Sequence, residues 1–265
     1  MNIQPSTKMK VSIIGAGAMG GAVARGLLAA RAVAPADMTV ANPHLAKIED
    51  LASRGVRVTT SNTDAATGAD IVIVAVKPWL IAGVIAEIAP AINPATTEVS
   101  AIVAGVPCAA LRDMFGDRVP ARLSIAMPNT AMTVRESMTF IVNASGEAAD
   151  ALSIFGPLGQ VMVIEERLLP GATALASCGI AYAMRYVRAA SEGGVELGFR
   201  ASAAQEIVAQ TLRGAVVLLA TEGAHPETEI DKVTTPGGLT IRGLNAMERA
   251  GFTAAVIDGL KASVK

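Results

Sequence analysis

The sequence predicts an α/β fold in which a doubly wound parallel sheet precedes an all-helical region. Up to Glu166, short apolar runs rich in β-branched residues alternate with helical stretches. Residues 71–76 read IVIVAV, a continuous apolar run typical of a strand buried on both faces of a parallel sheet. After Glu166 no convincing strand pattern occurs. We therefore expect one domain over residues 1–166 and a helical domain over residues 167–265.

Each expected element follows from its local pattern. The expected strands cover residues 10–14, 38–41, 56–59, 71–76, 98–103, 122–126, 138–142 and 161–164. The helices expected among them cover residues 19–30, 45–53, 80–88, 109–114 and 147–155. In the helical region, apolar spacing predicts a long helix ended by Gly193, Gly194 and Gly198, a helix through 208–219, and helices over 230–233, 240–249 and 253–263.

Composition excludes several classes of protein. The chain has 265 residues, with 22 Lys and Arg against 23 Asp and Glu. This balance argues against a general nucleic-acid binder, and the 52% hydrophobic content argues against disorder. The densest apolar runs, 71–76 and 215–220, are far shorter than the roughly 20 residues of a membrane-spanning helix. We expect a soluble protein with no membrane or nucleic-acid partner.

The N-terminal residues and the cysteines point to the cytoplasm. Residues 1–10 are polar and lack the apolar core of a secretory signal. Cys108 and Cys178 lie far apart with no metal-ligand spacing, so we expect two small buried residues, not a disulfide or catalytic thiols. No metal site is expected.

The glycine motif Gly15-Ala16-Gly17-Ala18-Met19-Gly20 follows an expected strand and opens an expected helix. In this context the glycines permit a tight turn and a close backbone approach, and the helix N-terminus offers N–H groups to a pyrophosphate. A glycine-rich turn without a ligand is the alternative. The repeated β-α units favour a dinucleotide-binding, Rossmann-type domain.

The end of the second strand favours NADP over NAD. NAD-binding proteins usually place Asp or Glu there for the ribose 2′-hydroxyl, whereas this chain has Asn42, Pro43 and His44, with Lys47 one turn further on. No carboxylate would repel a 2′-phosphate, and Asn42 could donate a hydrogen bond to it. Asn42-Pro43 as a simple turn, and NAD as cofactor, remain alternatives; His44 is expected to be a solvated loop residue.

Three further segments lie where ligands are expected. Ala75-Val76-Lys77-Pro78 and Met127-Pro128-Asn129-Thr130 end strands at the carboxyl edge of the sheet. Residues 234–240, TTPGGLT, precede an amphipathic helix whose exposed N–H groups and hydroxyls suit a small carboxylate. Each segment could also be an ordinary strand end, turn or helix cap.

Together these segments resemble the pyrroline-5-carboxylate reductase family. The matching segments are IGAGAMG (14–20), AVKP (75–78), AGV (104–106), MPNT (127–130), HPE with VTTPGGLTIRGL (225–244) and ERAGFTAAVIDGL (248–260). The likeness covers essentially the whole chain, and the PGG-x-T-I-x-GL element is far more specific than the glycine motif. The resemblance implies a helical dimerisation domain, a homodimer or larger homo-oligomer, and NADPH-dependent reduction of a cyclic imine to proline.

The resemblance also implies roles for individual positions. The phosphate loop falls on Gly15 to Gly20, and the adenosine-side contacts fall on Asn42 and Asn62. The nicotinamide-side segment is Ala75, Val76, Lys77 and Pro78, and Lys232 lies where the family often contacts the cofactor of the partner subunit. The imine carboxylate is expected on Thr235, Gly238, Leu239 and Thr240, with Asn129 on the substrate side and Thr240 hydrogen-bonding the ring nitrogen as the catalytic residue.

The sequence departs from the family pattern at a few positions. Ile125 replaces an arginine and Ala131 a proline in R-x-M-P-N-T-P, and ASCGIAY (176–182), with Ile180, stands where SGSGPAY is common. A substrate-lining glutamate is expected near Glu222 or Gly223. These departures leave open a paralogue acting on another cyclic imine, or a non-catalytic NADP-binding sensor. A β-hydroxyacid dehydrogenase is disfavoured because residues 171–198 contain no lysine.

Overall fold

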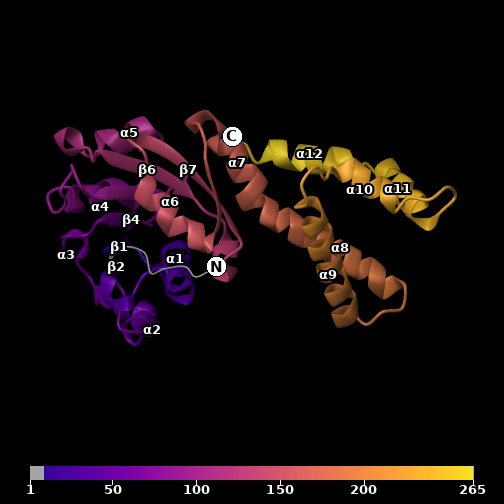
Figure 1. Cartoon of the computed structure of the whole chain (residues 1–265), viewed down its shortest axis with the longest axis horizontal. Helices are drawn as coiled ribbons and strands as arrows, with labels where there is room; N and C mark the ends of the chain where they lie inside the picture. Colours follow the sequence, from indigo (N-terminus) through magenta and orange to yellow (C-terminus); the bar gives the residue numbers. More distant parts are fainter. Residues whose placement is uncertain (1–8, 265) are drawn as a thin grey trace. The chain divides into compact units, whose positions relative to one another are not determined.

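The computed structural model describes residues 9–264, which form two compact units. The first unit extends to Ser177 and the second begins at Cys178. The expected division after Glu166 stays a prediction. Figure 1 shows the order of the elements along the chain.

The first unit is built on one eight-stranded sheet in the order β3-β2-β1-β4-β5-β6-β7-β8. The strands are β1 (Val11–Ile14), β2 (Met38–Ala41), β3 (Arg57–Thr59), β4 (Ile71–Val74), β5 (Glu98–Ala101), β6 (Arg122–Met127), β7 (Ser137–Ser145) and β8 (Gly159–Val163). The order β3-β2-β1-β4-β5-β6 is that of a doubly wound dinucleotide-binding sheet, as expected.

The sheet is parallel, as expected, except at one pair. β7 runs antiparallel to β6, and β8 returns parallel to β7. Only the short 3-10 segment η5 (Thr130–Val134), ended by Arg135 in the left-handed conformation, joins β6 to β7. A parallel neighbour needs a crossover of a dozen or more residues, so this short connection leaves only the antiparallel arrangement.

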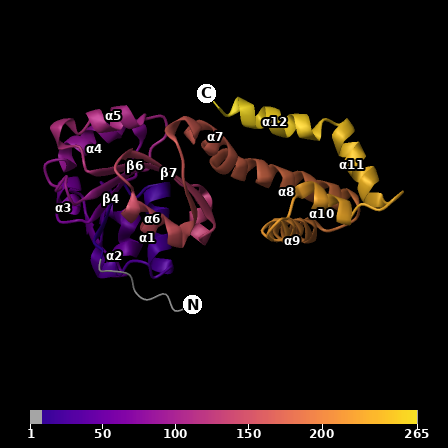
Figure 2. The same ribbon diagram turned by 45° about the horizontal axis from the view of Figure 1, so that its top comes forward.

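Helices cover both faces of the sheet (Figure 2). On one face, α1 (Ala18–Ala29) and α6 (Ala149–Phe155) pack on alternate residues of the central strands, such as Ile71 and Ile73. On the other, α3 (Asn62–Ala66), α4 (Ile81–Ile88) and α5 (Cys108–Asp113) cover Val72 and Val74. Because β4 is buried on both faces, its run is apolar at every position. The expected helix over 45–53 is split into η2 (Leu45–Ile48) and α2 (Glu49–Ala52), and α3 was not expected.

A short mixed helical segment follows the sheet. It consists of η7 (Glu166–Leu168), α7 (Leu169–Ala172) and the π-helix η8 (Thr173–Cys178). The remaining short 3-10 segments are η1 (Pro35–Asp37), η3 (Pro78–Leu80), η4 (Gly116–Arg118) and η6 (Gly156–Leu158).

The second unit contains α8 (Gly179–Glu196), α9 (Ala201–Leu219), α10 (Pro226–Lys232), α11 (Leu239–Arg249) and α12 (Phe252–Ala262). Gly193 and Gly194 lie inside α8, so the expectation that they end it is wrong. A Cβ at Gly194 would lie 2.9 Å from that of Ala204, so this glycine admits the close approach of α9. α8 ends before Gly198, whose φ of +98° favours glycine.

The apolar side chains of this helical unit are largely uncovered within one chain. Ala204 is buried, whereas Leu197, Val216 and Leu239 are 81%, 66% and 84% exposed. Separately, none of the helices within residues 9–264 combines the length and the apolar character needed to cross a membrane.

Candidate functional site

A cavity of about 600 Å³ lies at the carboxyl edge of the sheet, in the first unit. Its wall comes from the segments that follow β1, β2, β4, β5 and β6, together with the π-helix. The lining residues are Gly15, Gly17, Ala18, Met19, Asn42, Pro43, Ala75, Val76, Lys77, Pro78, Leu80, Ile102, Val103, Ala104, Met127, Pro128, Asn129, Thr130, Thr173 and Ser177. The sheet thus brings together the expected phosphate loop, the 75–78 segment and Asn129.

The three motif glycines differ in what surrounds them. Gly15 has a φ of +89°, and a Cβ there would lie 2.5 Å from the carbonyl oxygen of Ala75. A Cβ on Gly20 would clash with the carbonyl oxygen of Gly15, so these two glycines are required by the chain itself. Gly17 faces open space, with nothing within 4 Å of a Cβ built on it.

The start of α1 fits a pyrophosphate. Gly17 is its N-cap residue and makes no side-chain cap hydrogen bond, and no acidic residue occupies the first turn. The first N–H groups of a helix lack partners within the helix and attract anions. An open glycine beside uncapped N–H groups is the cradle that a dinucleotide phosphate requires, so the loop fits NADP.

Asn42 is buried and holds the neighbouring turns. Its Oδ1 accepts a hydrogen bond from the N–H of Ala16 at 3.4 Å, and its Nδ2 donates to the carbonyl oxygen of His44 at 2.8 Å. The side chain therefore ties the end of β2 to the phosphate loop. Its contact with a 2′-phosphate stays a prediction, and His44 is exposed, as expected.

Asn62 and Lys77 occupy different places relative to the cavity. Asn62, the first residue of α3, donates from Nδ2 to Oε2 of Glu87 at 2.8 Å and is absent from the lining. Lys77 is exposed and lines the cavity just after β4. The adenosine-side role of Asn62 and the nicotinamide-side role of the 75–78 segment stay predictions.

Asn129 is 6% exposed and joins the loop after β6 to the π-helix. Its Oδ1 accepts from the N–H of Ala131 at 3.1 Å, and its Nδ2 donates to the carbonyl oxygen of Ala176 at 3.2 Å. The bond to Ala176 positions the π-helix, whose Thr173 and Ser177 line the cavity. Sequence reasoning gave these two residues no role, because they lie outside the segments that follow the strands at this edge.

The expected substrate segment lies in the second unit. Gly237 has a φ of +71°, and a Cβ on Gly238 would lie 2.5 Å from Oγ1 of Thr235, so the turn needs both glycines. α11 begins at Leu239, with Gly238 as an N-cap residue that makes no side-chain cap hydrogen bond. Thr240 is exposed in the first turn. The uncapped N–H groups and hydroxyls suit a carboxylate.

Lys232 has a partner within its own helix, and Ile125 lies in the hydrophobic core. Nζ of Lys232 pairs with Oε1 of Glu229 at 2.6 Å, one helical turn away in α10. Ile125, which replaces the family's arginine, is fully buried in the core beneath α4 and α5 and does not line the cavity. The cofactor contact of Lys232 stays a prediction.

The cysteines are free, and one differs from expectation. Burial raises the pKa of the Cys108 thiol to about 11, and the nearby Glu166 carboxylate adds to the shift. The N–H of Cys108 donates to Oε1 of Glu166 at 2.7 Å. Cys178 is half-buried and not buried as expected.

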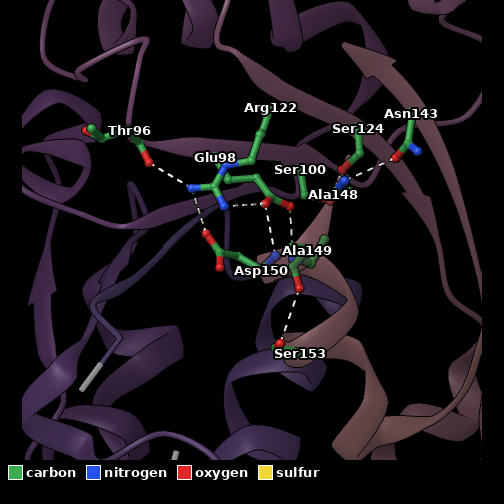
Figure 3. Close-up of polar contacts among 11 residues, drawn as sticks. Thr96, Glu98, Ser100, Arg122, Ser124, Asn143, Ala148, Ala149, Asp150 and Ser153 are labelled. Carbon is green, nitrogen blue, oxygen red and sulfur yellow. Dashed lines mark hydrogen bonds and ion pairs between the residues drawn. The ribbon is translucent and has the colours of Figure 1, made fainter. Parts of the chain in front are cut away.

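The amino edge of the sheet is closed by charged groups (Figure 3). Glu98, the first residue of β5, is fully buried and accepts hydrogen bonds from the N–H groups of Asp150 and Ala151 at the start of α6. Arg122 lies 3.6 Å from the Glu98 carboxylate and 3.0 Å from that of Asp150. Desolvation by burial raises the pKa of Glu98, although the two backbone N–H groups oppose the shift.

Comparisons with known proteins agree with this architecture. Residues 166–265 match the family model described as pyrroline-5-carboxylate reductase dimerisation. Residues 10–104 match the model described as NADP oxidoreductase coenzyme F420-dependent.

Individual relatives match almost the whole chain. Pyrroline-5-carboxylate reductase 1 of Dictyostelium discoideum is 40% identical over 96% of this chain, which spans 48% of that protein's length. Reductase 2 of the same organism is 35% identical over 96% of this chain and 91% of its own. A crystal structure of Plasmodium falciparum pyrroline carboxylate reductase with NADP bound superposes with a TM-score of 0.85 at 25% identity, covering 97% of this chain and 95% of that one. The chain belongs to the pyrroline-5-carboxylate reductase family.

Proposed function

We propose that this chain reduces 1-pyrroline-5-carboxylate to proline by hydride transfer from NADPH. The observation that carries the proposal is the cavity that begins at the open glycine loop and contains no Asp, Glu, His or Cys in its lining. Such a wall offers no thiol or imidazole and no carboxylate base. Hydride transfer to an imine needs neither, because its main requirements are position and the exclusion of water.

The chain's own groups would bind and orient the reactants. NADPH supplies the hydride when bound. The uncapped N–H groups at the start of α1 would hold its pyrophosphate, while the 75–78 and 127–130 segments would form the wall around the nicotinamide. The turn at Thr235 and Gly238 and the first turn of α11 would hold the substrate carboxylate. The Thr240 hydroxyl would hydrogen-bond the imine nitrogen, which favours its protonated, electrophilic form.

The departures from the family pattern at residues 125 and 131 do not reach the cavity wall. Ile125 lies in the core, and Ala131 is absent from the lining. This placement favours an active reductase over a cofactor sensor. Another cyclic imine as substrate, and NADH as a weaker donor, are the alternatives that the test below separates.

The helical region, proposed to span residues 167–265, would serve as the dimerisation and substrate domain of a homodimer or larger homo-oligomer. The family model over 166–265 and the exposed apolar residues Leu197, Val216 and Leu239 support this assignment. Sedimentation of the purified chain would test it, since a monomer at micromolar concentration would contradict it. A cytoplasmic location stays a prediction, tested by cell fractionation.

The decisive experiment is a panel of cyclic imines assayed with NADPH and with NADH. We expect turnover that is fastest with pyrroline-5-carboxylate and NADPH. Thr240→Ala should lower kcat about a hundredfold with an unchanged Kd for NADPH. Thr211→Ala, which removes a helical hydroxyl bonded to the carbonyl oxygen of Ile207, is the matched control. Cofactor binding without turnover of any imine would instead indicate a sensor.

A further inference from the structure

The nicotinamide end of the cavity can be located from the sheet order. A dinucleotide lies across the point where the order reverses, between β1 and β4, with its pyrophosphate at the loop after β1. Asn42 and Pro43 follow β2 and lie on the adenosine side. The nicotinamide therefore falls beside the segments that follow β4, β5 and β6, where Asn129, Thr130, Thr173 and Ser177 provide the polar groups.

Two of these four polar side chains already have partners. Asn129 uses both ends of its side-chain amide, and Oγ1 of Thr173 donates to the carbonyl oxygen of Leu169 at 2.8 Å. The hydroxyls of Thr130 and Ser177 have no hydrogen-bond partner within residues 9–264. Thr130 is exposed, whereas Ser177 is half-buried in the wall. A half-buried hydroxyl without a protein partner gains more from a ligand than an exposed one.

The π-helix holds Ser177 in this position. Residues four apart lie within one turn of a π-helix, so Thr173 and Ser177 share the face that lines the cavity. Asn129 fixes this turn by its bond to Ala176, the residue next to Ser177.

We infer that Ser177 is a cofactor-binding residue whose hydroxyl hydrogen-bonds the carboxamide of the nicotinamide ring. The carboxamide carries both a donor and an acceptor, and a hydroxyl can serve either. This inference rests on the proposed function, since it assumes that NADPH occupies the cavity.

The test measures binding of two ligands by titration calorimetry. The ligands are NADPH and 2′-phospho-ADP-ribose, which lacks the nicotinamide. Ser177→Ala should weaken NADPH binding about three- to tenfold and leave 2′-phospho-ADP-ribose unchanged, because one hydrogen bond is lost. Ser177→Thr, which keeps a hydroxyl, should restore most of the affinity and also guards against a folding defect in the alanine variant.

The controls separate this inference from the proposed function. Ser153→Ala, in α6 at the amino edge, should change neither affinity. Unchanged NADPH binding in Ser177→Ala, or equal weakening for both ligands, would overturn the inference while leaving the proposed function intact. Failure of the unaltered protein to bind NADPH would overturn both.

Discussion

The two edges of the sheet in the first unit use polar groups in opposite ways. At the amino edge, Arg122 pairs with Glu98 and Asp150, and the Glu98 carboxylate accepts the N–H groups at the start of α6. At the carboxyl edge, the N–H groups that begin α1 have no side-chain cap, and Gly17 faces open space. The difference teaches that the amino edge is built for stability, whereas the carboxyl edge keeps its polar groups available for a ligand.

The largest expected effect on stability comes from removing the Glu98 carboxylate at the amino edge. Glu98→Ala should lower the free energy of unfolding by about 3 kcal/mol, because it leaves two backbone N–H groups without an acceptor and removes one of the two carboxylates that face Arg122. Urea denaturation measures this change. Glu49→Ala, an exposed control on α2, should change stability by less than about 0.5 kcal/mol. A Glu98→Ala variant that is as stable as its parent would remove the structural role assigned to this cluster.

A pair of glycine variants contrasts stability with binding at the carboxyl edge. Gly20→Ala should cost about 1–3 kcal/mol of stability, because its Cβ meets the backbone of Gly15. Gly17→Ala should leave the thermal midpoint nearly unchanged, yet weaken NADPH binding about tenfold or more, since its methyl group enters the space of the phosphate. Calorimetric scans and NADPH titrations measure the two effects. Equal behaviour of the two variants would contradict the difference between these glycines.

The pH dependence of stability should reveal the raised pKa of the Glu98 carboxyl. Its pKa is raised in the folded state from an ordinary value of 4.5, so the folded state binds more protons than the unfolded state in the interval above that value. The stabilisation is thus complete below pH 4.5 and is lost as pH rises through the raised pKa. Relative to Glu98→Gln, the parent protein should lose stability across this interval. A parallel pair of stability curves would show that burial does not raise this pKa.

The last prediction concerns the reactivity of the Cys108 thiol, which changes neither stability nor binding. With a thiol pKa of about 11, its thiolate fraction at pH 8 is roughly a hundredfold below that of an ordinary cysteine. Iodoacetamide should therefore modify native Cys108 far more slowly than after unfolding in urea. Peptide mass spectrometry measures both rates, and fast modification of the native protein would contradict the burial described.

Much of this fold could be predicted because the relevant signals are local. The run at 71–76 predicted β4, and the glycine motif predicted the turn into α1. The antiparallel β7 could not be predicted, since the decisive feature is the short connection after β6. Gly194 was misread as a helix end because its purpose is the contact with Ala204.

The candidate site was predictable to a similar degree. Its loops were found because each follows a strand at the same edge. Ser177 was missed because it follows no strand; it reaches the cavity wall from the helical segment after the sheet. Glu98 was missed because its partners in α6 lie about 50 residues away along the chain.

Hydrogen–deuterium exchange with and without NADPH tests the central difference between the two edges most directly. The predicted result is protection of amides at the carboxyl edge, in residues 15–20, 75–80 and 102–106. Amides in residues 96–98 and 149–151 at the amino edge should exchange as before. Protection confined to the amino edge, or spread evenly over both, would contradict the assignment of the carboxyl edge as the cofactor site.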